Sequence, residues 1–160
     1  LITNSLLLSP EINIYLRLHP NLSKKEDELK LWMIFQHIFK DNVTLILPDE
    51  PVDSYELAKS SDLNFVYHSS IGAEIMALGR HVYSLNSCRY DYLYGCTIVN
   101  NTHHLSEIID AHYLAETKQF DKTISQNGLQ YLYSATNFGD KFIYYKPESS
   151  LFGTFMGIHL

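Results

Sequence analysis

Two adjacent serines, Ser69 and Ser70, stand where a short β-rich run gives way to a helical pattern. A strand that turns directly into a helix brings backbone N–H groups, small hydroxyls and the positive end of the helix dipole to one point. Such a point suits an anion, most often a phosphate. We expect both hydroxyls and the N–H groups of Ile71 and Gly72 to approach it, with Gly72 leaving room for the ligand. The alternative is that Ser70 only caps the helix.

Three further residues are placed to complete such a site. His19 follows the β-rich run 12–18, and its imidazole can bind a phosphate oxygen or donate a proton near neutral pH. Glu74 falls in the first turn of the helix and can accept hydrogen bonds from vicinal ribose hydroxyls. Pro48 opens a turn after the largely apolar run 43–47. A structural role for His19 and a solvated helix-face role for Glu74 stay open at this point.

The other reactive side chains match no familiar motif. The spacing of Cys88, Cys96, His103 and His104 is not that of a zinc site, so no metal and no cofactor is expected. The serines lack the flanking glycines of a nucleophile elbow, and neither a P-loop nor a Gly-x-Gly-x-x-Gly fingerprint is present. The two cysteines are expected to be reduced thiols.

The composition narrows the class of protein. A chain of 160 residues with 46% hydrophobic residues is most economically one globular domain. Its formal charge of −6 gives no support to a nucleic-acid surface. The longest apolar runs fall far short of the roughly 20 residues that span a membrane. The chain begins at Leu1 without a methionine, and we expect a fragment of a longer protein.

Strand and helix patterns alternate along the first half of the chain. This alternation predicts an α/β fold with a Rossmann-like, doubly wound parallel sheet, in which ligands bind outside the carboxyl ends of the strands. Capping-box spacings, Ser23 with Glu26 and Asp53 with Glu56, predict helices that start near Ser23 and Asp53, and Gly79 is the expected C-cap of the helix after the serines. The apolar stripe of the first helix is expected at Leu31, Ile34, Phe35 and Ile38.

Three segments, taken together, resemble a known family. The residues Arg17-Leu18-His19-Pro20-Asn21, the run 51–57 and the run 69–79 are similar to the C-terminal, nucleotide-sugar-binding half of GT-B glycosyltransferases. Within that family they most resemble the bacterial capsule and surface polysaccharide biosynthesis proteins. The resemblance covers roughly residues 12–100. It departs from the pattern at His81, where a proline is usual, and in the lack of a second glycine after Gly72.

The resemblance implies roles for the candidate residues. His19, Ser69 and Ser70 would contact the phosphate of a donor, with a CMP-sugar favoured, and His19 would be the catalytic group that stabilises the leaving phosphate. Glu74 would bind the ribose, and the turn from Pro48 would hold the base with main-chain groups. The partners would be a nucleotide-sugar donor and a glycan acceptor, with no nucleic acid.

The same resemblance implies an organisation and a location. Residues 1–160 would be one nucleotide-sugar-binding domain of a two-domain cytoplasmic transferase, with 115–160 as a C-terminal helical extension. The missing N-terminal half would supply the catalytic base and a peripheral association with the inner face of the membrane. UDP-sugar 2-epimerases share a His-Pro-Asn element and a serine–glycine turn. An isomerase of that kind and a non-catalytic nucleotide-binding module are therefore the alternatives.

Overall fold

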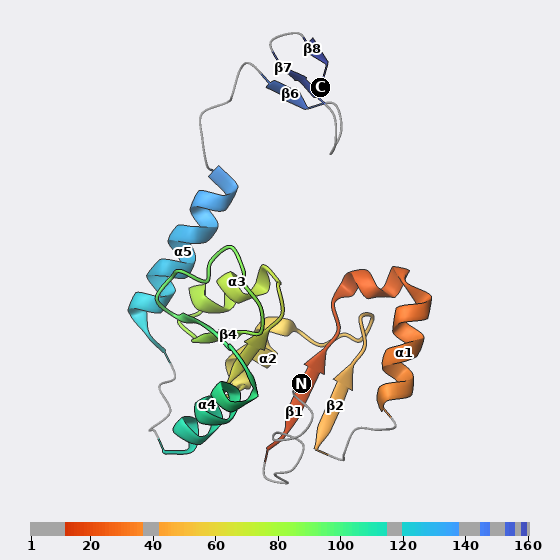
Figure 1. Ribbon diagram of the computed structural model, residues 1–160, viewed down its shortest axis with the longest axis vertical. Coiled ribbons are helices and arrows are strands. Elements are labelled where there is room, and N and C mark those ends of the chain that lie inside the picture. Colours follow the sequence, from red (N-terminus) through yellow and green to blue (C-terminus); the bar gives the residue numbers. More distant parts are fainter. Residues whose placement is uncertain are drawn as a thin grey trace.

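The protein has a mixed α/β structure, seen here in a computed structural model that describes residues 12–36, 42–114, 120–137, 145–147, 153–155 and 158–159 (Figure 1). Along the chain the elements are β1 (Ile14–Arg17), the 3₁₀ turn η2 (Pro20–Lys24), α1 (Glu26–Gln36), β2 (Val43–Ile46), α2 (Ser54–Ser60), β3 (Asn64–Val66), α3 (Ile71–Ala77), β4 (Val82–Ser84), β5 (Cys96–Ile98), α4 (Thr102–Leu114), α5 (Lys122–Asn137), β6 (Tyr145–Pro147), β7 (Gly153–Phe155) and β8 (Ile158–His159).

The first five strands form two short parallel sheets. Strands β1 and β2 pair with each other, and β3, β4 and β5 form a second sheet in that order. Among the described residues no ladder joins β1 to β3, so the single continuous sheet expected from the sequence is seen only as two pieces. A shared apolar cluster connects them: Ile14 of β1 and Phe65 of β3 both pack against Leu105 and Ile109 of α4.

The main core lies on α3 and α5. Ile75 and Met76 of α3 pack with Val66, Val82 and Ile124. Helix α5 is therefore part of the body rather than an extension of it.

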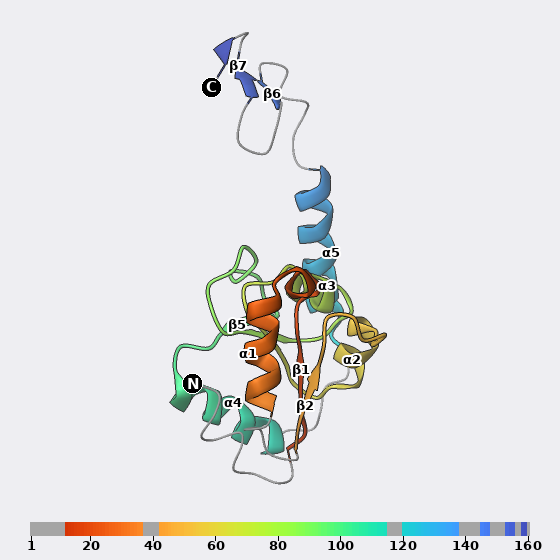
Figure 2. The ribbon, with the colours of Figure 1, turned by 90° about the vertical axis from the view of Figure 1, so that its right-hand side faces the viewer.

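After α5, the described residues from Tyr145 onward form three short antiparallel strands, β6 to β8, which lie beyond the end of α5 in both views (Figures 1 and 2). Of the described residues in 115–160, where a helical extension is expected, those of α5 are helical and those from Tyr145 onward are in strands.

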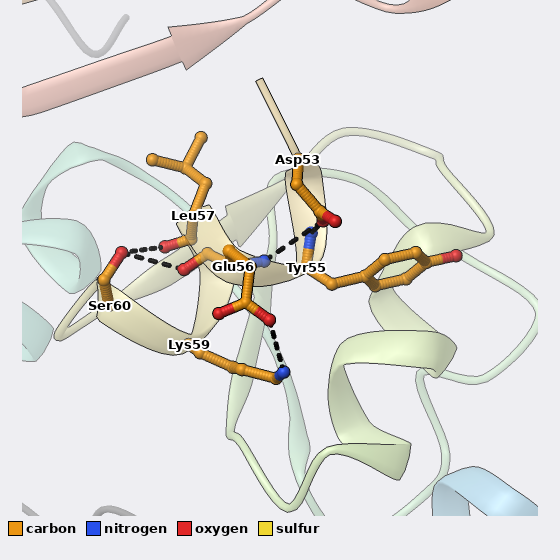
Figure 3. A network of polar contacts seen from close by, with 6 residues as sticks. All are labelled: Asp53, Tyr55, Glu56, Leu57, Lys59 and Ser60. Atoms are coloured by element: carbon orange, nitrogen blue, oxygen red, sulfur yellow. Dashed lines mark hydrogen bonds and ion pairs between the residues drawn. The ribbon is translucent and has the colours of Figure 1, made fainter. Parts of the chain in front are cut away.

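Helix ends follow local chemistry. The Asp53 side chain accepts hydrogen bonds from the N–H groups of Tyr55 (2.7 Å) and Glu56 (3.2 Å), so the Asp53 half of the predicted capping box is present (Figure 3). Glu56 itself bonds Lys59 (2.6 Å), one turn further on. Gly79 has φ +74°, and its N–H donates to Met76 (2.7 Å), which confirms the predicted glycine stop of α3.

The first helix differs from expectation in its start and in its packing face. Ser23 lies inside η2 and donates to the Pro20 carbonyl (2.8 Å), so it does not cap α1, which begins at Glu26. Leu31 and Ile34 are more than half exposed, at 54% and 59%. The half-buried side chains among those described in this helix are Leu29 and Trp32, so its less exposed face differs from the expected stripe. The Phe35 side chain and Ile38 lie outside the described part.

No helix within the described residues is both long enough and apolar enough to cross a lipid bilayer.

Candidate functional site

The serine turn follows β3 through a strained residue. His68 has φ +49°, a left-handed conformation that is uncommon for residues other than glycine. Ser69 and Ser70 come next, and Ser70 occupies the N-cap position of α3 in a helical conformation, with no hydrogen bond from its side chain to the helix. Its side chain is exposed. The alternative that Ser70 serves only as a capping side chain is therefore not what the geometry shows.

Gly72 is buried for a reason different from the one expected. A Cβ atom added at this position would lie 2.1 Å from the Tyr90 hydroxyl oxygen. Tyr90 also donates a hydrogen bond to the Ser69 carbonyl. The space that the glycine leaves is filled by this tyrosine, so the prediction that it stays open for a ligand is wrong.

Some backbone N–H groups of the serine turn donate hydrogen bonds to carbonyls of the same turn. The N–H of Gly72 points to the Ser69 carbonyl (3.4 Å), and that of Ala73 donates to the Ser70 carbonyl (3.0 Å). Ile71 begins α3 and packs its side chain against the core. Because α3 has only seven residues, its dipole is small, and an anion here depends mainly on side-chain donors.

His19 is exposed and held in one orientation. It is the N-cap of η2, and its Nδ1 accepts a hydrogen bond from the Asn21 N–H (3.1 Å). A neutral imidazole that accepts through Nδ1 carries its proton on Nε2, so the outward nitrogen is a donor. In Figure 1 the turn between β1 and α1 lies at about the height of α3 but on the other side of the body, and among the described residues no hydrogen bond joins His19 to Ser69 or Ser70.

His68 is a residue that sequence reasoning missed. Its Nδ1–H donates to the Ser87 carbonyl (2.9 Å), which leaves the Nε2 lone pair as an acceptor. This is the reverse of the arrangement at His19. Both rings are exposed. The left-handed backbone of His68 has no signal in a sequence pattern, and the only hint was its place directly before the serines.

Glu74 has a partner that was also missed. The Tyr55 hydroxyl donates a hydrogen bond to Glu74 Oε2, and this bond raises the pKa of the tyrosine. Figure 3 shows Tyr55 extending outward from the first turn of α2, where the Asp53 cap holds its backbone. Glu74 is therefore a partly buried carboxylate tied to a neighbouring helix rather than a freely solvated one.

The main-chain groups next to Pro48 form hydrogen bonds with other residues of the protein. Pro48 is buried, and the Leu47 N–H donates to the Glu50 carboxylate (2.7 Å). The Leu47 carbonyl accepts from Arg17 and from the Glu50 N–H (3.2 Å). The main-chain groups of Leu47 are thus used within the protein. Arg17 Nε is buried and has no hydrogen-bond partner among the described residues.

A shallow surface hollow lies elsewhere, at the start of α4. Its lining residues are Asn100, Asn101, His103, His104 and Glu107. None of the predicted site residues borders it. Across the described residues, no three His, Cys, Asp or Glu side chains are grouped in a way that could hold a metal ion.

Comparisons with protein-family models, curated proteins and solved structures find no match to this chain.

Proposed function

We propose that this chain is the donor-binding domain of a glycosyltransferase that builds a surface or capsular polysaccharide. Ser69, Ser70 and His19 hold the phosphate of a nucleotide-sugar, with a CMP-sugar favoured. The observation that carries this proposal is the Ser70 hydroxyl, which is exposed at the turn and makes no capping bond to its own helix. A serine hydroxyl that follows a strand and makes no capping hydrogen bond is available to bind a ligand.

The finer fold belongs to the same proposal. In a doubly wound Rossmann-like sheet of the GT-B type, β1 and β3 are neighbours at the point where the strand order reverses, and ligands bind there. The packing of Ile14 and Phe65 on one face of α4 supports this order, β2-β1-β3-β4-β5. His19 and the serine turn would then flank a single crevice.

The proposed catalysis of sugar transfer follows from the hydrogen-bond donors around the phosphate. When the bond between sugar and phosphate breaks, negative charge develops on the leaving phosphate. The outward Nε2–H of His19 and the two hydroxyls stabilise this charge more than they stabilise the bound donor, which lowers the barrier. Glu74, oriented by Tyr55, accepts bonds from the ribose. In this proposal an N-terminal half supplies the acceptor-binding site and the catalytic base. This chain alone therefore binds nucleotide without transferring sugar.

Calorimetric titration with CMP, CDP, UDP and GDP tests the proposal. We expect a cytidine nucleotide to bind best. Replacing both serines, Ser69→Ala with Ser70→Ala, removes two hydrogen bonds to a charged group, each contributing about 1.5–3 kcal/mol, and should weaken binding by about 100-fold or more.

Ser60→Ala is the matched control. The Ser60 hydroxyl donates only to carbonyls of its own helix, those of Glu56 (2.8 Å) and Leu57 (3.0 Å), as Figure 3 shows. Its affinity should equal that of the unmodified chain. Equal affinity in the double serine variant would contradict the phosphate role. For the unmodified chain, a preference for UDP would favour the 2-epimerase-like isomerase. Failure of the unmodified chain to bind any of the four nucleotides would overturn the proposal.

A further inference from the structure

We propose that His68 binds the sugar of the donor: its Nε2 atom accepts a hydrogen bond from a sugar hydroxyl next to the phosphate, so this residue distinguishes a nucleotide-sugar from a free nucleotide. The inference rests on the proposed function, but it concerns a histidine that the phosphate site of His19, Ser69 and Ser70 does not use. His68 lies between β3 and α3, is exposed, and immediately precedes the two serines.

The backbone of His68 adopts a conformation that a glycine would adopt more easily. Its φ of +49° lies in the left-handed region, where glycine has no steric cost and most other residues do. Residues held in such conformations are concentrated at active sites and ligand-binding sites. The turn itself does not require an imidazole, so a role for His68 lies in its ring.

The imidazole ring of His68 is held in one orientation by Ser87. Nδ1 lies 2.9 Å from the Ser87 carbonyl oxygen, and because a carbonyl oxygen only accepts, Nδ1 carries the proton. Ser87 is itself fixed, since its N–H donates to Asn86 Oδ1 and its hydroxyl donates to Asp91 Oδ2, both at 2.8 Å. The ring therefore rests on a hydrogen-bonded loop, and Nε2 keeps its lone pair for another group.

The same loop is joined to the serine turn at a second point. The Tyr90 hydroxyl donates a hydrogen bond to the Ser69 carbonyl. His68 and Ser69 are consecutive residues, so the turn is bonded to the loop through its histidine ring and through the next carbonyl. These two contacts keep the imidazole beside the serine residues that are proposed to hold the phosphate.

The lone pair of Nε2 determines which ligand group can bind to His68. The ionised phosphate oxygens of a nucleotide-sugar carry no hydrogen, so a neutral imidazole has nothing to accept from them. The hydroxyls of Ser69 and Ser70 are donors for the phosphate, whereas His68 supplies an acceptor next to them. In a nucleotide-sugar the sugar is bonded directly to the phosphate, which brings sugar hydroxyls close to the phosphate oxygens. A sugar hydroxyl is therefore the donor that fits Nε2.

The test is a calorimetric titration of the full chain at pH 8, which keeps imidazoles neutral, with two matched pairs of ligands: CMP with CMP-N-acetylneuraminate, and UDP with UDP-glucose. The variant is His68→Asn. Asparagine tolerates a left-handed backbone, and its amide N–H can replace Nδ1–H at the Ser87 carbonyl, but it has no counterpart of Nε2. We expect unchanged affinity for the free nucleotide and about two- to tenfold weaker binding of the nucleotide-sugar, which is the loss of one hydrogen bond between neutral groups.

A matched control and a spectroscopic readout accompany the titration. His103→Asn makes the same change at an exposed histidine of α4 and should alter neither affinity. The ¹⁵N signal of His68 Nε2 in the unmodified chain should shift with the nucleotide-sugar and stay in place with the free nucleotide. Weaker binding in His103→Asn together with an unmoved His68 signal would place the ligand at the α4 hollow and overturn the inference.

The remaining outcomes separate this inference from the proposed function. If His68→Asn weakens both ligands of a pair equally, or weakens neither, the contact with the sugar is wrong while nucleotide binding stands. If the expected difference is found for the uridine pair only, the sugar contact stands and the preference for a CMP-sugar fails. If the unmodified chain binds none of the four ligands, the proposed function fails and the sugar contact fails with it.

Discussion

At the scale of single residues, Gly72 shows how one position can be chosen by packing rather than by a ligand. Its missing side chain makes space for Tyr90, whose hydroxyl bonds the carbonyl of the residue that begins the candidate site. Tyr90 therefore joins the core to the serine turn. The pKa of Tyr90 is raised chiefly by burial, so its hydroxyl stays a donor at neutral pH.

Gly72→Ala tests this contact. The added methyl group collides with the Tyr90 ring, and overpacking of this kind costs about 1–3 kcal/mol of unfolding free energy. Tyr90→Phe removes the nearest atom and should recover part of the loss when the two changes are combined. Urea unfolding of the four proteins measures this coupling. A loss in the double variant equal to the sum of the two single losses would show that Tyr90 is not what Gly72 accommodates.

Residue types and spacing identified some groups and missed others for a clear reason. His19 and the serines could be predicted as candidates because they directly follow apolar runs. The hydrogen bonds of His68 and Glu74 to Ser87 and Tyr55 each join residues 19 positions apart, so they depend on how the chain folds back. No local pattern encodes such contacts.

At the scale of elements, α5 is held to α3 at a glycine. A Cβ atom added at Gly128 would lie 2.3 Å from the Ala77 backbone nitrogen. Ser125, one turn earlier, donates to the Ala77 carbonyl (2.8 Å). The close approach of the two helices therefore depends on residues with small side chains.

Gly128→Ala gives a test with an informative sign. In an unpacked helix this change stabilises by about 1 kcal/mol, because alanine favours helix. In the close contact with α3 it should instead destabilise by about 1–3 kcal/mol. Gln130→Ala, at an exposed position of the same helix, is the control and should change the unfolding free energy by less than about 0.5 kcal/mol. A stabilising Gly128→Ala would mean that α5 does not pack as described.

His81, just before β4, makes stability depend on pH. Burial lowers the pKa of this histidine, against a smaller opposing effect of Asp121. As the pH falls through about 6.5, the unfolded chain binds a proton at this residue while the folded chain resists, so the folded state loses stability, by at most about 1.4 kcal/mol per pH unit.

The measurement compares urea midpoints at pH 7.5 and 5.5 for the unmodified chain and for His81→Asn. An asparagine keeps a polar partner for the Thr97 hydroxyl, which the imidazole Nε2 contacts at 2.9 Å, but it does not titrate. The variant should lose less stability on acidification. The same loss in both proteins would assign the pH dependence to other titratable groups.

Strands and helix ends were the most predictable elements. The apolar run before Pro48 became β2, and Gly79 ends α3 as expected, because both depend on local chemistry. The packing face of α1 and the joining of the sheets were not predictable in the same way. They depend on how much surface neighbouring elements present, and strands of three or four residues present little.

At the scale of the whole molecule, two parallel sheets share one apolar cluster beneath α4, and polar turns follow β1 and β3. Two histidines with opposite tautomers, one donating and one accepting through Nε2, stand at these turns. Of the two, the proposed donor-binding function uses only His19, whose Nε2–H can donate to a phosphate oxygen. The hollow at the start of α4 offers a different location for a ligand, so the two can be distinguished by mapping.

The most direct measurement is a titration of the ¹⁵N-labelled full chain with CMP, followed by amide and imidazole NMR signals. The account predicts saturable shifts at His19, Ser69, Ser70 and Glu74, with the His19 Nε2–H signal moving as it bonds the phosphate. Shifts confined to the residues around Asn101 and His104, or no saturable shift at all, would contradict it.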